Sequence, residues 1–257
     1  MASFLITGAS RGFGLALVKE LASLPPSKVS NIIAASRSQS TALDELIKSD
    51  TTNRIEQVRL DVTNRDSIAT AAAEVEAKLG DKGLDVLINN AGVLEYSFGG
   101  TSSMENLESS FAVNVLGVHH VTQSFFPLLI KGNLKKVANI STTLGSIAVA
   151  PSFAAMPAPA YKIIKAAMNA LTVQWALDHE KDGFTFVALC PGWMKTELGG
   201  GDMADLTPEQ GAKASLDIIF NKSQAEVNGK MAKVFVEGLD KPAEGRLNVY
   251  DGSDAPW

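Results

Sequence analysis

The chain has 257 residues, with 23 lysines and arginines against 28 aspartates and glutamates, and a formal net charge of −5. This balance gives no electrostatic reason to expect a nucleic acid or an anionic membrane as partner. No segment reaches the roughly 18 unbroken apolar residues that a membrane span needs. Cys190 is the only cysteine, so no internal disulfide can form and we expect a cytoplasmic protein.

Short apolar runs alternate with helical patterns along the whole chain. The apolar runs predict strands at 3–7, 31–36, 55–60, 84–89, 135–141, 184–190 and 232–237. The helical patterns lie between them, at 12–24, 40–49, 64–79, 104–130, 161–181 and 208–220. This alternation predicts an α/β Rossmann fold, with a doubly wound, mostly parallel seven-stranded sheet and helices on both faces. No linker or repeat interrupts it, so we expect one domain over residues 1–257.

The first predicted strand ends in the glycine-rich turn TGASRGFG, residues 7–14. Glycines let the backbone turn tightly and approach a ligand, and the following helix offers free N–H groups to a pyrophosphate. Such a turn is persuasive here because it joins a strand to a helix in the first crossover. We therefore predict a dinucleotide site. Its contacts in the turn are Gly8, Ser10, Arg11, Gly12, Phe13 and Gly14.

The end of the second predicted strand indicates which dinucleotide binds. An acidic residue there usually holds a ribose 2′-hydroxyl, whereas a 2′-phosphate needs positive charge. This chain has Ser36 and Arg37 at that point, with no acid until Asp44. Arg11 in the glycine turn can reach the same phosphate, and the planar guanidinium pairs well with phosphate oxygens. We predict NADP(H) as the cofactor.

Tyr161 and Lys165 lie one turn apart near the start of a predicted helix, just after Pro157 and Pro159. An isolated pair of this kind is usually a solvated surface pair. A lysine ammonium and a helix N-terminus beside a phenol favour the phenolate, so we expect the pKa of Tyr161 to be lowered. That would suit Tyr161 to general acid–base chemistry.

Further motifs follow in order: NNAG at 89–92, FAVNVLG at 111–117, NIST at 139–142 and CPGWMKT at 190–196. With the glycine turn and the Tyr–Lys pair, they resemble the short-chain dehydrogenase/reductase family over nearly the whole chain. Within that family, STTLGSI, PGWMKTELGG and YDGSDAPW are most similar to C-factor, sniffer-type carbonyl reductases and fungal ketoreductases of aromatic polyketides.

The resemblance implies a role for each matching residue. Tyr161 is the proton donor, Lys165 binds the nicotinamide ribose, Asn114 holds a water in a proton relay, and Thr196 holds the nicotinamide carboxamide. The implied cofactor contacts outside the glycine turn are Ser36, Arg37, Asp61, Val62, Asn90, Ala91, Gly92, Tyr161, Lys165, Pro191, Gly192, Met194 and Thr196. Relatives are often homodimers or homotetramers through their two long helices.

The pattern leaves two candidates for the hydroxyl that polarises the substrate carbonyl. The family motif places it at Thr142, and Ser141 remains the alternative. Because side chains alternate along a strand, the two hydroxyls are expected to face opposite ways.

Two loops are candidates for substrate contact. The loop at about 143–160 is longer than in most relatives and carries no charge, so it predicts an apolar wall that includes Phe153 and Met156. The alternative is a loop that packs on its own core or on another subunit. A lid at about 193–207 carries Trp193 and three successive glycines. Trp193 can stack on a substrate or serve in packing.

These observations predict an NADPH-dependent ketoreductase for a hydrophobic ketone, aromatic or polyketide-derived. The alternative is a regulatory or signalling protein of the same fold that binds the dinucleotide with little turnover. His119 and His120 have no third ligand nearby in the pattern, so we expect no metal site.

Overall fold

The computed structural model describes residues 1–244 and 247–257, and its eight strands form one sheet. The strands are β1 (Ala2–Thr7), β2 (Val29–Ser36), β3 (Ile55–Arg59), β4 (Val86–Asn89), β5 (Lys136–Ile140), β6 (Thr185–Cys190), β7 (Met231–Lys233) and β8 (Asp254–Ala255). Their order is β3-β2-β1-β4-β5-β6-β7-β8, and every neighbouring pair is parallel except β7 with β8. The predicted doubly wound, mostly parallel sheet is confirmed.

The sheet has one strand more than the predicted seven. The extra strand, β8, is only two residues long, too short to show any periodicity in the sequence. The seventh strand is also shorter than the predicted 232–237, because β7 ends at Lys233. Beyond it, Phe235 makes a single bridge to Asp251.

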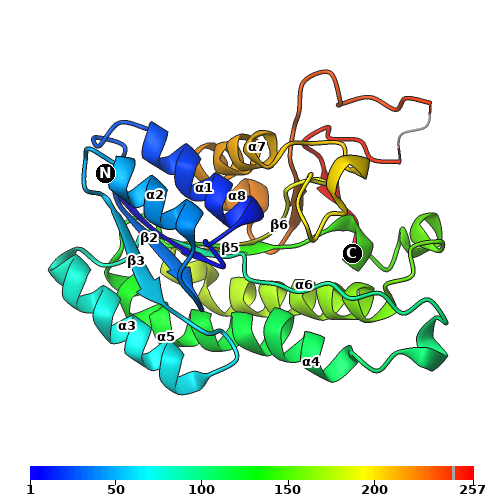
Figure 1. Cartoon of the computed structure of the whole chain (residues 1–257), viewed down its shortest axis with the longest axis horizontal. Coiled ribbons are helices and arrows are strands. Elements are labelled where there is room, and N and C mark those ends of the chain that lie inside the picture. The colour runs from blue at the N-terminus through cyan, green and yellow to red at the C-terminus, as the bar shows by residue number, and fades with distance from the viewer. Residues whose placement is uncertain (245–246) are drawn as a thin grey trace.

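Helices cover both faces of the sheet (Figure 1). One layer holds α1 (Gly12–Ser23), α2 (Thr41–Ser49), α7 (Pro208–Asn221) and the short α8 (Gln224–Val227). The other holds α3 (Arg65–Leu79), α4 (Leu107–Phe111), α5 (Gly117–Lys131) and α6 (Pro159–His179). Along β1, Phe4 and Ile6 pack in the first layer and Leu5 in the second, as alternation along a strand requires. Short 3₁₀ turns lie at Gly80–Lys82, Thr101–Ser103, Thr143–Gly145, Ala150–Phe153, Glu180–Asp182 and Gly201–Met203.

The helix that carries the Tyr–Lys pair begins earlier than predicted. We expected the prolines to bar the helix until Tyr161, but α6 begins at Pro159. A proline is well suited to the first helical position, because the N–H it lacks has no partner there. Tyr161 therefore lies in the first turn of α6.

The predicted helix at 104–130 is interrupted. It divides into α4, a π-helical turn over Ala112–Leu116 and α5. A π turn accommodates one extra residue in a helix and often marks a functional position. Here it contains Asn114, which is fully buried.

Within the described part of the chain, no helix is both long enough and apolar enough to cross a bilayer.

Candidate active site

The strand order reverses between β1 and β4, and doubly wound folds bind ligands in the crevice outside the carboxyl ends of such strands. The segments that follow these strands are joined by hydrogen bonds. The Thr7 hydroxyl accepts from the backbone N–H groups of Asn90 and Ala91, both at 3.0 Å. The Asn90 side-chain amide donates to the carbonyls of Thr7 (2.8 Å) and Gly8 (3.2 Å). The glycine turn and the NNAG segment therefore form one unit.

Two glycines of the turn are required by close packing. Gly8 has φ +68°, and a Cβ there would lie 2.9 Å from the Cα of Ala91. A Cβ on Gly14 would lie 2.3 Å from the Gly8 carbonyl oxygen. Arg11 and Gly12 are exposed, and the Arg11 side chain makes no capping hydrogen bond to the first N–H groups of α1. An uncapped, accessible helix N-terminus fits the phosphates of a dinucleotide.

Both arginines predicted to select the cofactor are exposed at this edge of the sheet. Arg11 forms an ion pair with Glu197, with Nη1 and Oε2 2.6 Å apart. Arg37 lies close enough to Asp61 to affect it: hydrogen bonds from the Thr63 hydroxyl and backbone N–H lower the pKa of Asp61, and the charge of Arg37 adds to this effect. Arg37 therefore brings positive charge to this edge of the sheet, whereas the charge of Arg11 is paired with Glu197.

The other predicted cofactor contacts around the glycine turn and the end of β2 have different surroundings. Phe13 is the second residue of α1, and its side chain is buried in the core. The Ser36 hydroxyl is occupied, because it donates to the Ser38 carbonyl at 2.9 Å and accepts from Gln57 at 3.3 Å. The Ser10 carbonyl accepts from the Ser40 hydroxyl at 2.7 Å. Val62 packs against Gly117 of α5, where a Cβ on the glycine would lie 3.0 Å from Cγ2 of Val62.

Tyr161 and Lys165 lie on the same side of α6, as predicted. The Lys165 Nζ is 5.6 Å from the centre of the Tyr161 ring. Both residues are buried, and Lys165 Nζ donates to the Ile140 carbonyl at 2.6 Å. Burial lowers the pKa of Lys165 to about 8. An ammonium with that pKa can release and regain a proton near neutral pH.

The expected direction of the Tyr161 pKa was wrong. Burial raises the pKa of the phenol well above its usual range. The physical reason is that desolvation disfavours the phenolate, while the ammonium that should favour it is bonded to the Ile140 carbonyl. Tyr161 therefore keeps its proton at neutral pH, which is the form that can donate one.

Asn114 has a buried oxygen in need of a partner. Its Nδ2 donates to the Ser110 carbonyl at 3.0 Å and the Val93 carbonyl at 3.2 Å. Its Oδ1 is buried and has no hydrogen-bond partner among residues 1–244 and 247–257. A buried, unpaired acceptor costs free energy, and ordered water is the usual way of satisfying one. The position fits a water at Asn114, next to Gly92, where a Cβ would lie 2.8 Å from this oxygen.

The two candidate hydroxyls after β5 lie in different environments. The Ser141 hydroxyl is buried and donates to Oδ1 of Asn169 at 2.6 Å. Thr142 is half-buried, and its hydroxyl accepts from the Leu144 N–H at 3.3 Å, which leaves its own proton free to donate. Of these two residues, only Thr142 is partly open to solvent.

The predicted substrate loop lies beside the start of α6. Phe153 is half-buried, and its carbonyl accepts from Lys162 Nζ at 2.6 Å. Met156 packs against the cluster that contains Tyr161. It also lines a groove of about 460 Å³, whose other walls include Phe98, Lys162 and Ile163.

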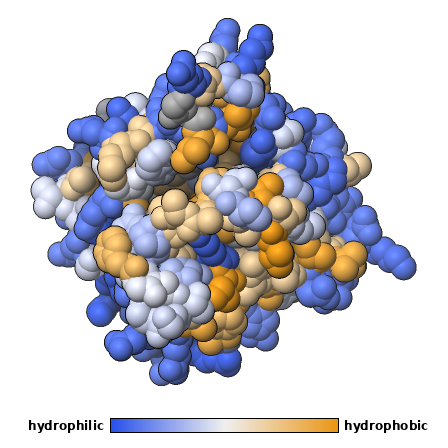
Figure 2. All heavy atoms as spheres, turned by 90° about the vertical axis from the view of Figure 1, so that its right-hand side faces the viewer, coloured by the Kyte–Doolittle hydropathy of each residue, from blue (hydrophilic) through white to orange (hydrophobic). Residues whose placement is uncertain are grey.

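Figure 2 shows this end of the molecule, where apolar side chains gather in patches around a hollow. Ile147 of the substrate loop is 77% exposed, and Trp193 of the lid is 36% exposed. Large apolar side chains of both predicted substrate segments are therefore accessible.

Backbone hydrogen bonds join the two ends of the predicted lid to each other. The Leu206 N–H donates to the Trp193 carbonyl at 3.0 Å, and the Lys195 N–H donates to the Leu206 carbonyl at 2.8 Å. Inside the lid, Trp193 Nε1 donates to the Gly199 carbonyl at 2.7 Å, and the Thr196 hydroxyl accepts from the Gly199 N–H at 3.0 Å. The Trp193 indole is thus held against the lid itself.

Three predicted contacts flank the base of the lid. Pro191 is buried, and Gly192 adopts φ +90°. The Met194 side chain packs against Gly211 of α7, so it points into the core. A Cβ on Gly12 would come 3.5 Å from the Thr196 methyl, so the lid reaches the glycine turn.

Behind the site lies a buried polar chain, in which sequence reasoning expected only Asn89 or Asn90 of NNAG to tie neighbouring strands together. Asn89 Nδ2 donates to Asn139 Oδ1 at 2.8 Å and to the Thr122 hydroxyl at 3.0 Å. Asn139 Nδ2 donates to the Thr172 hydroxyl at 2.9 Å. This chain links α5, β4, β5 and α6. The signal was present, since Asn139 is an amide in an apolar strand, and Asn169 follows Lys165 by four residues on the same helix face.

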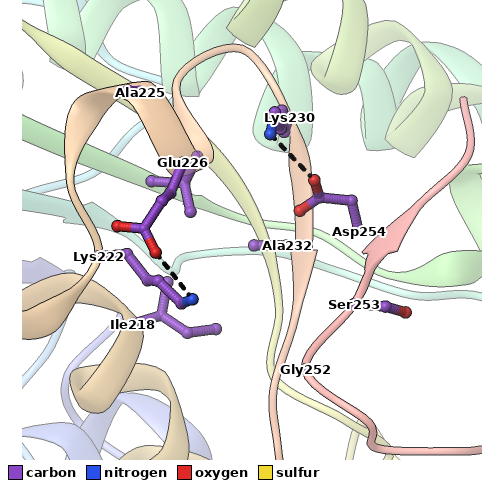
Figure 3. Close-up of a pocket in the computed structure, with 10 residues that line it drawn as sticks. Ile218, Lys222, Ala225, Glu226, Lys230, Ala232, Gly252, Ser253 and Asp254 are labelled. Carbon is purple, nitrogen blue, oxygen red and sulfur yellow. Dashed lines mark hydrogen bonds and ion pairs between the residues drawn. The ribbon is translucent and has the colours of Figure 1, made fainter.

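A separate pocket of about 400 Å³ lies far from these residues, beside α7, α8, β7 and β8 (Figure 3). Its lysines are paired: Lys222 with Glu226 at 3.0 Å and Lys230 with Asp254 at 3.2 Å. Its walls contain no residue predicted for the site.

The doubly wound sheet, the glycine turn in its first crossover and the buried Tyr–Lys–Asn group define a dinucleotide-dependent oxidoreductase fold. The short chain dehydrogenase family profile matches residues 3–206. The short-chain dehydrogenase anuI of Penicillium roqueforti is 32% identical over 237 residues, covering 88% of this chain and 92% of that protein. The chain belongs to the short chain dehydrogenase family, as the motifs predicted.

Two solved structures of carbonyl reductases are similar over the whole chain. An NADPH-bound carbonyl reductase from chicken fatty liver has 28% identity and a TM-score of 0.85, and the match covers 100% of this chain and 99% of that one. The carbonyl reductase Sniffer of D. melanogaster has 27% identity and a TM-score of 0.84, with both chains covered completely.

Proposed function

We propose that this protein is an NADPH-dependent ketoreductase that reduces a hydrophobic, aromatic or polyketide-derived carbonyl compound, with Tyr161 as proton donor. The observation that carries the proposal is the burial of Tyr161, Lys165 and Asn114 together beside the crevice. A protein that only reported dinucleotide levels would have no need for this acid–base group. NADPH, when bound, supplies the hydride.

The chain's own residues fit NADPH better than NADH. Arg11 and Arg37 supply positive charge at the adenosine end, and the uncapped start of α1 suits the pyrophosphate. The related chicken carbonyl reductase was solved with NADPH bound. Asn90, Ala91 and Gly92 adjoin the glycine turn, and Thr196 belongs to the lid that reaches it.

The proton chemistry follows from three side chains. Tyr161 holds a proton at neutral pH because burial raises its pKa. Lys165, with a pKa of about 8, lies beside it and can exchange a proton with a neighbouring water. The unpaired Oδ1 of Asn114 suits such a water, so Tyr161, Lys165 and Asn114 form a path along which the lost proton is replaced. Thr142 orients the carbonyl through its free hydroxyl proton.

The substrate class rests on the apolar side chains around the crevice. The uncharged 143–160 loop, with Phe153 and Met156, and the partly exposed Trp193 favour a bulky apolar ketone over a small polar one. A homodimer or homotetramer is supported by large apolar side chains exposed on α5 and α6, among them Ile130 (52% exposed) and Leu177 (65% exposed). The single buried cysteine, Cys190, suits a reducing compartment such as the cytoplasm.

The direct test follows NADPH absorbance while ketones of increasing size are offered, from small aliphatic to polycyclic aromatic, with NADH in parallel. We expect consumption of NADPH that increases with the apolar size of the ketone. No consumption with any ketone, despite tight NADPH binding, would refute the ketoreductase proposal.

A further inference from the structure

The C-terminal segment returns to the lid and contacts both of its ends. Tyr250 is buried, and its ring packs against Gly192, where a Cβ would lie 2.9 Å from the ring carbon Cε1. The Tyr250 hydroxyl donates to Oδ2 of Asp205 at 2.5 Å and accepts from the backbone N–H of Trp193 at 3.3 Å. One phenol oxygen thus bridges the first residue of the lid and a residue near its end.

Asp205 receives a second donor from the same segment. The Asn248 amide Nδ2 lies 2.9 Å from Asp205 Oδ2. Burial raises the pKa of Tyr250, and the hydrogen bond to Asp205 raises it further, so the phenol remains a donor across the physiological range. The contact is therefore a charge-assisted hydrogen bond in a mostly buried place, which is stronger than a neutral one.

The lid between these anchor points has its own internal hydrogen bonds, and its tip is rich in glycine. Gly200 and Gly201 have φ of +84° and +67°, and Gly199 precedes them. Because Trp193 and Thr196 are both bonded to Gly199 inside the lid, the base of the lid determines where these two residues lie. The backbone pairs at Leu206 join the two ends of the lid to each other, and Tyr250 ties these ends to the C-terminal segment, in addition to the packing of Met194 on Gly211 of α7.

The same segment also reaches the substrate loop. The Trp257 carbonyl accepts from the Ala148 N–H at 3.0 Å. In Figure 1 the red C-terminal segment extends between the yellow lid and the green loop. Both loops predicted to contact substrate are therefore held by residues 250–257.

We propose that Tyr250 and Asp205 are positioning residues of the active site, which hold the lid so that Thr196 and Trp193 stay over the crevice. The proposal rests on the proposed function for its effect on catalysis. If a fraction of molecules has a displaced lid, the apparent affinity for cofactor and ketone falls by that fraction, while chemistry in the closed molecules is unchanged.

The test compares Tyr250→Phe with Tyr96→Phe. Both remove one hydroxyl and keep the ring, and Tyr96 is an exposed residue stacked on Phe98 away from the lid. We expect Tyr250→Phe to raise the NADPH dissociation constant and the KM for ketone about fivefold with kcat within about twofold of wild type. Amide hydrogen exchange at Lys195 and Leu206 should become about tenfold faster. Tyr96→Phe should leave exchange at Lys195 and Leu206 unchanged.

A second pair of variants separates positioning from general destabilisation. Asp205→Asn keeps an acceptor oxygen for Tyr250 and should retain near-normal exchange, whereas Asp205→Ala should behave like Tyr250→Phe. Unchanged exchange at Lys195 and Leu206 in Tyr250→Phe would overturn the proposal. The exchange experiment needs no cofactor, so its result stands even if NADPH proves not to bind and the proposed function fails.

Discussion

The ammonium of Lys165 donates a 2.6 Å hydrogen bond to the carbonyl of Ile140, the last residue of β5. This bond ties α6 to the carboxyl end of the central sheet at the point where Tyr161 is buried. It also places a cation in a largely desolvated position. Burying a charge costs free energy unless it is fully compensated. The buried Lys165 ammonium therefore lowers the stability of the folded chain.

That cost predicts a stability gain on removing the charge. The pKa of Lys165 is about 8 in the folded chain and near 10.4 when unfolded, so the charged lysine destabilises the fold below pH 8. The cost disappears as pH rises from about 8 to about 10.4. We expect Lys165→Met to abolish turnover. At pH 7 its free energy of unfolding should be about 1–3 kcal/mol higher than that of wild type, and this difference should shrink toward pH 10. Denaturant unfolding at several pH values measures this. A variant less stable than wild type at pH 7 would contradict it.

The two hydroxyls after β5 should respond differently to deletion. Ser141→Ala leaves the buried Oδ1 of Asn169 without its 2.6 Å partner, so we expect a loss of about 1–3 kcal/mol in stability with turnover largely kept. Thr142→Val removes the half-exposed hydroxyl, and we expect turnover to fall at least about tenfold with little change in stability. Steady-state kinetics and thermal unfolding of both variants provide the comparison. The reverse pattern would assign the catalytic hydroxyl to Ser141.

Charge reversal should reveal the preference for a 2′-phosphate. Changing both Arg11 and Arg37 to Glu should raise the NADPH dissociation constant at least about tenfold and affect NADH much less. Reversing the exposed Lys19 and Lys48 changes the net charge equally and serves as the control. Equal weakening by both double variants would mean that only overall charge matters and that the arginines do not contact the phosphate.

The fold was largely predictable because each strand and helix carries its own apolar period. Deviations occurred where the backbone departs from regular geometry: the π turn around Asn114 keeps a helical appearance in sequence, and β8 is too short to show a pattern. Asn114, Tyr161 and Lys165 could be recognised by motif, and the structure brings them to one side of the sheet.

Their electrostatics could not be read from spacing. The pKa of Tyr161 depends on burial and on the direction of the Lys165 ammonium, which points to the Ile140 carbonyl. Likewise, no local pattern connects Tyr250 with Asp205, because that contact arises only when the C-terminal segment folds back over the lid.

The most direct test of the account is turnover of NADPH with a bulky aromatic ketone by Tyr161→Phe, together with its NADPH dissociation constant. Removing the phenol oxygen takes away the proton donor and leaves the ring packing intact. We predict that turnover falls by at least about a hundredfold while NADPH binding stays within about threefold of wild type. Turnover within twofold of wild type would show that Tyr161 is not the proton donor and would contradict the central claim.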